Sequence, residues 1–218
     1  MQKKSLKKTM LMVLVLVLVC LVSVGATLAY LTAHTGAVTN TFVVGQLFNP
    51  PESSDDGDPT NDIGLFLKEH KATHAGNGVY NLGTEEVDTN TYSDILPGVN
   101  VAKDPFVRVN GLKVDAYLFI EVAKNLQPEL SYAVDDSKWE ATTLAGKHGG
   151  TVYKYKGVDG VAKAGNLGDI NILKNQQIVV APTYSADTAG QTLTFYAYII
   201  QSAGFNGDVT AAWAQVSH

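Results

Sequence analysis

Apolar residues recur at every second position in several short segments of this chain, and a period of two is typical of β-strands with one buried face. The alternation covers residues 106–109, 117–122, 153–156, 178–180 and 193–200. Breaks at 110–111, 148–150 and 157–160 contain the glycine and asparagine that tight turns require, and we expect Asn110-Gly111 to form a hairpin turn. Many short strands with few helices predict an all-β fold, an antiparallel sandwich or a barrel.

Two of these segments indicate which side chains face the core. Successive side chains of a strand point to opposite faces of the sheet, so residues two apart share a face. By this rule Leu118 and Ile120 share one face of their segment, and Phe195, Ala197 and Ile199 share one face of theirs. We expect these five side chains to point inward.

One helical signal lies near the C-terminal end. The segment Asn206-Gly207-Asp208 can cap a short helix in which Val209, Ala212, Trp213 and Val216 are spaced at i, i+3, i+4 and i+7. Such a helix has one apolar face. We expect that face to pack on the sandwich.

The first 29 residues combine a basic block with an apolar run, which is the pattern of a secretory signal peptide. Four lysines fall within the first eight residues, and residues 10–22 carry no charge. Small residues precede the bond between Ala29 and Tyr30, where a signal peptidase would cut. The uncharged stretch 9–32 is also long enough to cross a bilayer, so an uncleaved membrane anchor is the alternative. We expect a signal-peptide helix at 1–29, a single domain at 30–218, and a secreted or cell-surface protein that touches the membrane only through an uncleaved signal.

The amino-acid composition of the chain narrows the classes of molecule that it can bind. The chain carries a net charge of −5, and because residues 1–29 contain four lysines and no acidic residue, the mature chain carries −9. An acidic surface with a single arginine, Arg108, argues against a nucleic-acid partner. Cys20 is the only cysteine and leaves with the signal, so the mature chain has no disulfide and no thiolate metal site.

Two clusters of metal-binding residue types are weak candidates. The segment 49–62 holds five acidic residues, but their order does not match a calcium loop, and a solvated acidic loop is the favoured interpretation. His70 and His74 are four apart, which on a helix would place them on one face, as in zinc sites. Lys71 stands where the metalloprotease pattern needs glutamate, so we expect no zinc catalysis.

No catalytic motif is present elsewhere. The serine-nucleophile pattern G-x-S-x-G and the phosphate-binding loop G-x-x-x-x-G-K-[ST] do not occur, and we expect no catalytic residue, cofactor or resident metal. Aromatic side chains on one sheet face could instead stack on sugar rings, which keeps a glycan-binding platform open as an alternative to ordinary cross-strand pairing. The tyrosines in question are Tyr117, Tyr153, Tyr155, Tyr196 and Tyr198.

Three segments together resemble the TasA/camelysin family of secreted bacterial biofilm-matrix proteins, which carry a SipW-type signal peptide. The first is GATLAYLTAHTGAVTNTFVVGQL (25–47), similar to the family's small-residue cleavage site, aromatic new N-terminus and Asn-x-Phe-x-x-Gly motif. The second is ILPGVNVAKDPFVRVNGLKVDAYLFIEV (95–122), similar to its Pro-Gly, Lys-Asp-Pro, Val-x-Asn-x-Gly and Ala-Tyr string. The third is YAYIIQSAGFNGDVTAAWAQV (196–216), similar to its closing Gln-x-x-Gly-Phe and Ala-Trp. The chain departs from the family where Gly111 directly follows Asn110 and across 127–175, which matches none of its motifs.

The resemblance implies a jelly-roll β-sandwich, processing by a SipW-type signal peptidase, and assembly into extracellular fibres or a surface layer. Its partners would be further copies of itself and other matrix or anchoring proteins. TasA-like fibres are joined by an N-terminal donor strand, and residues 30–45 are apolar, uncharged and β-prone, as strand addition to an exposed sheet edge requires. The candidate donor residues are Tyr30, Leu31, Val38, Phe42 and Val44.

Alternatives to this assembly remain open from the sequence. Residues 30–36 could be a free tail and 38–44 an ordinary edge strand. A camelysin-like surface metalloprotease is the enzyme alternative, and an adhesin for glycans or host surfaces is the binding alternative. Bound zinc would distinguish the first of these, and retention on polysaccharide beads the second.

The signal peptide yields a direct prediction. Protein recovered from the culture medium should begin at Tyr30, because the basic block, the apolar run and the small residues before Ala29 together direct cleavage there. N-terminal sequencing checks this. A secreted protein that still begins at Met1 would contradict it.

Overall fold

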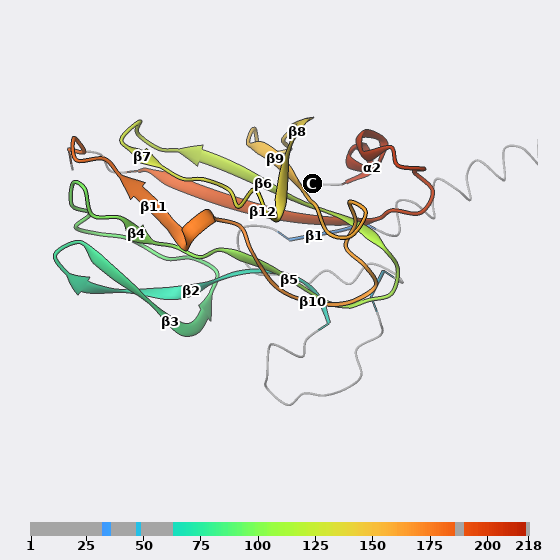
Figure 1. Ribbon diagram of the computed structural model, residues 1–218, viewed down its shortest axis with the longest axis horizontal. Coiled ribbons are helices and arrows are strands. Elements are labelled where there is room, and N and C mark those ends of the chain that lie inside the picture. Colours follow the sequence, from blue (N-terminus) through green and yellow to red (C-terminus); the bar gives the residue numbers. More distant parts are fainter. Residues whose placement is uncertain (1–31, 36–46, 49–62, 186–189, 217–218) are drawn as a thin grey trace, which may run out of the picture.

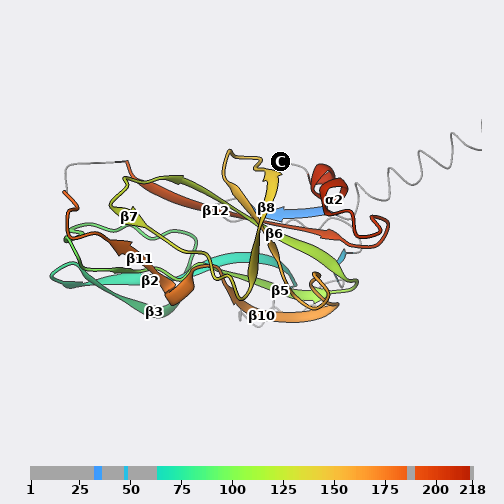
Figure 2. The ribbon, with the colours of Figure 1, turned by 45° about the horizontal axis from the view of Figure 1, so that its top comes forward.

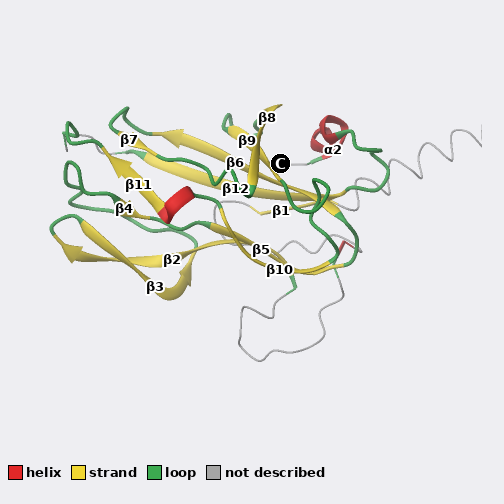
Figure 3. Ribbon diagram, viewed as in Figure 1, coloured by secondary structure: helices red, strands yellow, loops and turns green. Residues whose placement is uncertain are grey.

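The computed structural model describes residues 32–35, 47–48, 63–185 and 190–216, and most of these lie in β-strands (Figure 3). One short helix, α2 (Val209–Gln215), follows the last strand, and a 3-10 turn covers Lys174–Gln176. The predicted signal helix lies outside the described residues. Among the described helices none is long and apolar enough to span a membrane. The strands are β1 (Thr32–Thr35), β2 (Gly64–Gly76), β3 (Val79–Val87), β4 (Val101–Ala102), β5 (Phe106–Leu112), β6 (Ala116–Asn125), β7 (Leu130–Ser131), β8 (Trp139–Ala145), β9 (Thr151–Tyr155), β10 (Gly165–Asn171), β11 (Gln177–Val180) and β12 (Thr192–Gln201).

These strands form three antiparallel sheets arranged as a sandwich. The first sheet has the order β1-β12-β6-β9-β8, the second β10-β5-β2-β3 and the third β4-β11-β7. In Figures 1 and 2 the first and second sheets form two layers, and the short third sheet lies at the end of the sandwich opposite α2. The predicted antiparallel β-sandwich with a short C-terminal helix is confirmed.

The longest ladder joins β12 to β6 and supplies much of the core. It runs without a register shift from Thr192 opposite Asn125 to Gln201 opposite Ala116. The inward residues predicted from parity are confirmed, because all five belong to the main buried cluster between the sheets. These are Leu118, Ile120, Phe195, Ala197 and Ile199.

The opposite face of the same two strands is buried as well. Phe119 of β6 and Tyr198 of β12 pack edge-on against Trp213 of α2, with ring centroids 5.2 and 5.1 Å apart. The side chain of Asp208 caps α2 by accepting a hydrogen bond of 2.9 Å from the N–H of Ala211, as the sequence predicts. The helix therefore closes a second, smaller core on the outer face of the first sheet.

The expected hairpin turn at Asn110-Gly111 is wrong. Both residues lie inside β5, where Gly111 has a φ of 69°. The register of β10 against β5 shifts at this point, with Gly165 opposite Leu112 and Leu167 opposite Val109, so β5 contains one extra residue. This is a β-bulge, which uses the same positive φ as a turn, and a short sequence signal does not distinguish the two.

The hairpin of β2 and β3 is an element that the periodicity did not predict. Asn77 and Gly78 join these strands with φ of 52° and 72°, the positive pair that a two-residue type I′ turn requires. Their dipeptide was a turn signal in the sequence. The flanking strands did not stand out, because polar and charged residues interrupt the apolar alternation.

The core register predicts the effect of one substitution. Ile120→Asp would place a carboxylate without a partner in the interior, where Ile120 is fully buried, and should cost about 4 kcal/mol or more of folding free energy. Thermal and urea unfolding measure this. Thr143→Asp, at an exposed position of β8, is the control and should change stability by less than about 0.5 kcal/mol. Equal stability of the two variants would contradict the register.

Candidate functional site

The first candidate site is the outer edge of β12, to which β1 is added as an edge strand. Four residue pairs form this short ladder, from Thr32 opposite Ile200 to Thr35 opposite Ala197. β1 also contacts β2 of the second sheet, so it lies on the side where the two layers face each other (Figure 1). The start of the predicted mature chain thus occupies a sheet edge through main-chain pairing.

The other half of that edge carries no described strand. β12 pairs with β6 over its whole length, whereas β1 covers only the half that ends at Ile200. Among the described residues, no strand pairs with Thr192–Tyr196 on the β1 side. An edge of this kind presents unpaired main-chain donors and acceptors to any extended segment that reaches it.

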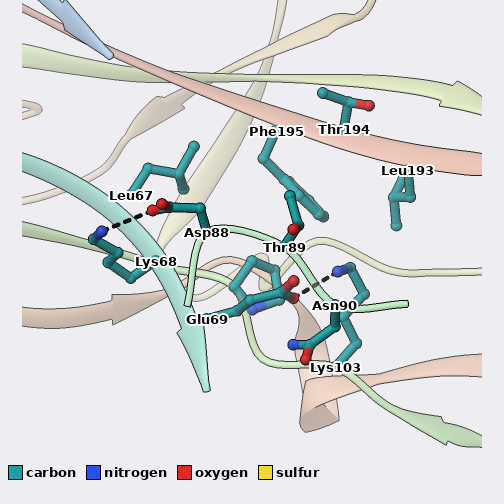
Figure 4. Close-up of a pocket in the computed structure, with 11 residues that line it drawn as sticks. Leu67, Lys68, Glu69, Asp88, Thr89, Asn90, Lys103, Leu193, Thr194 and Phe195 are labelled. Carbon is teal, nitrogen blue, oxygen red and sulfur yellow. Dashed lines mark hydrogen bonds and ion pairs between the residues drawn. The ribbon is translucent and has the colours of Figure 1, made fainter. Parts of the chain in front are cut away.

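The second candidate site is a buried ion pair between the layers (Figure 4). Lys103 directly follows β4, and its Nζ lies 2.6 Å from Oε2 of Glu69 in the middle of β2. Only 10% of the lysine side chain and 6% of the glutamate side chain are exposed. The ammonium also lies over the rings of Tyr92 and Phe195, 5.5 and 5.7 Å from their centroids.

A second acid–base pair lies next to the first along the same chain segments. Nδ1 of His70 lies 2.6 Å from Oδ2 of Asp104, and the His70 main-chain N–H donates to the same carboxylate at 3.0 Å. Asn90 holds the strand at this point, since its amide donates to the His70 carbonyl and its Oδ1 accepts from the N–H of Ala72. Polar groups from three separate chain segments therefore meet on β2.

Tyr92 completes this cluster. Its hydroxyl is buried and has no hydrogen-bond partner among the described residues. Burial raises the pKa of the Tyr92 phenol, and the neighbouring carboxylates of Glu69 and Asp104 raise it further. The phenol therefore stays protonated and available as a donor.

Two hollows adjoin the cluster. The one in Figure 4 has a volume of about 170 Å³ and lies beside Glu69, Asp88 and Lys103. A larger one of about 550 Å³ lies between Tyr92, Lys103 and the first residues of β12. Its lining is mostly apolar and includes several threonines and Tyr184.

The structure separates the two histidines that the zinc alternative requires. Both belong to β2, and residues four apart in an extended strand lie about 13 Å from each other. His74 stacks on Tyr80 with ring centroids 5.0 Å apart, while His70 contacts Asp104. No group of three metal-ligating side chains occurs within the described part of the chain.

The five tyrosines of the glycan alternative do not share one surface. Tyr117 and Tyr198 are buried in the core beneath α2, and Tyr196 packs at its margin. Tyr153 and Tyr155 pack against the main core on the other face of the sheet. The aromatic strip that the sequence suggested is therefore divided between two cores.

Two buried charged side chains were not predicted as structural residues. Arg108 of β5 donates two hydrogen bonds to Glu86 of β3 and one to Asp169 of β10, which ties three strands of the second sheet together. Glu121 of β6 is fully buried and accepts hydrogen bonds from the main-chain N–H groups of Lys147, His148 and Gly150. Both residues lie in segments where apolar residues alternate along the chain. A charged residue among neighbours that are expected to be buried was the sequence signal that could have identified them.

The remaining sequence candidates lie outside the described residues. These are the cleavage residues Ala29 and Tyr30, the donor residues Leu31, Val38, Phe42 and Val44, and the acidic segment 49–62.

Comparison of the chain with family models, with curated proteins and with solved structures finds no match.

The geometry predicts different effects for the two histidines. His70→Ala leaves the buried Asp104 carboxylate with only a main-chain donor and should cost about 1–3 kcal/mol. His74→Ala removes a stacked ring at an exposed position and should cost less than about 1 kcal/mol. Urea unfolding measures both. Zinc content should be the same in both variants and the wild type; zinc lost on either substitution would support the metalloprotease alternative.

Proposed function

We propose that this protein is a secreted structural protein of the bacterial cell surface or biofilm matrix, which assembles into fibres by exchange of its N-terminal strand. The observation that carries the proposal is the placement of β1. The first described residues of the mature chain form an added strand on the edge of β12, held by a four-residue ladder.

An edge strand at the chain start can be exchanged between identical molecules. The main-chain bonds that β1 makes to β12 are the same whether β1 belongs to that molecule or to a neighbour. Exchange therefore replaces one β1–β12 ladder by an equivalent one. The remaining free-energy cost is the entropy lost when two molecules associate. Among the described residues no strand pairs with the other half of the β12 edge, where an incoming strand could lengthen the ladder beyond four residues.

The resemblance to the TasA/camelysin family supports the same proposal from the sequence. The string 25–47 contains β1, and the string 196–216 contains the β12 residues that pair with it, which supports the proposal. Cleavage before Tyr30 would release the strand from the membrane, so that a secreted copy can dock on another subunit. A SipW-type peptidase and further matrix or anchoring proteins are its proposed partners.

Removal of the strand tests the proposal. The chain 30–218 should form fibres as its concentration rises, whereas the chain 37–218 should stay folded and monomeric because it has no strand to donate. Electron microscopy and light scattering measure assembly, and thermal unfolding checks the fold. A peptide of residues 30–45 should cap growth of the longer chain. Identical fibres from both chains would disprove strand exchange.

A reversible lock provides a matched control. Thr35 and Ala197 are directly opposed in the β1–β12 ladder, and the mature chain has no cysteine of its own. In the variant Thr35→Cys with Ala197→Cys, oxidation of the monomer should fix β1 on its own β12 and abolish fibres. Reduction should restore assembly in the same sample. Fibres formed equally by the oxidised monomer would contradict exchange.

A further inference from the structure

We propose that Lys103 and Glu69 condense to an amide, which links β2 covalently to the segment between β4 and β5. The inference is independent of the assembly proposal and rests on the buried ion pair. Its atoms Nζ and Oε2 are 2.6 Å apart, and both side chains are almost fully enclosed. This contact places the amine nitrogen against the carboxyl group whose carbon the new bond would join.

The surroundings favour condensation over a stable ion pair. Burial penalises separated charges, so transfer of a proton from the ammonium to the carboxylate costs less between the layers than in water. It produces a neutral amine, which is the nucleophilic form of lysine, and a carboxylic acid, which is the more reactive acyl group. The rings of Tyr92 and Phe195 flank the amine.

The reaction balances without any co-reactant. The lone pair of Nζ attacks Cδ of Glu69, and the tetrahedral intermediate loses one carboxyl oxygen. That oxygen leaves as water with two of the three ammonium protons, and the amide nitrogen keeps the third. Net charge is zero before and after. Groups fixed in contact reach effective concentrations of roughly 10⁵–10⁸ M, which favours the amide over hydrolysis.

Tyr92 lies beside the amine, with Nζ of Lys103 5.5 Å from the centroid of its ring. Its hydroxyl is buried without a hydrogen-bond partner among the described residues, and it interacts electrostatically with Glu69. The mature chain has no cysteine, so an amide is a covalent tie between these segments that its own residues can form.

The intact mass of the purified mature protein decides the question. The protein should be lighter than its sequence mass by one water molecule. Trypsin should then yield residues 69–71 joined to 72–108, because an acylated Lys103 is not cleaved. Lys71 and Glu85 are the internal control: they form an ion pair of 2.8 Å with more than half of each side chain exposed, and they should not lose water. A protein of full sequence mass, with free peptides 69–71 and 72–103, would overturn the proposal.

Two variants separate the amide from the ion pair. Lys103→Arg keeps the positive charge beside Glu69 but has no reactive amine, so it should show its full mass and melt about 10 °C below the wild type. Lys71→Arg, the matched exposed substitution, should keep the water loss and the wild-type melting temperature.

Discussion

The ladder between β6 and β12 is the constraint on which the rest of the structure depends. Its ten pairs run without a break, and both faces of the two strands are buried, one against the second sheet and one beneath α2. A strand covered on both sides cannot shift by one residue without exchanging its two sets of side chains. The position of every neighbour follows from this register, including the edge of β12 on which β1 lies.

The sequence predicted those parts of the fold that depend on residues close to one another in the chain. Alternation identified the inward residues of β6 and β12, and spacing with a capping aspartate identified α2. β2 was not predicted because charged and polar residues interrupt its apolar residues, and the partners of two of them lie far along the chain: Glu69 pairs with Lys103 and His70 with Asp104. A pattern within a short segment cannot reveal a contact between residues that lie 34 positions apart. The four-residue spacing of the histidines suggested a helix only because the strand was missed.

The two candidate sites have opposite requirements: the first needs a contact that can open, and the second a contact that stays closed. The edge of β12 works as an assembly surface only if a short, main-chain ladder can open and form again. The cluster around Glu69 and Lys103 joins β2 to the segment between β4 and β5 and opposes separation there. In the proposed assembly a strand at one edge exchanges while the contact in the interior stays in place, so exchange need not unfold the subunit.

The antiparallel direction of β1 and β12 has a mechanical consequence in the proposed fibre. Tension along a chain of subunits would pull the donated strand along its own axis, in shear, and not away from the edge. In shear every hydrogen bond of a ladder bears load at the same time, whereas peeling breaks them one by one. A ladder that is short enough to exchange at rest can therefore resist stretching once the fibre is under load.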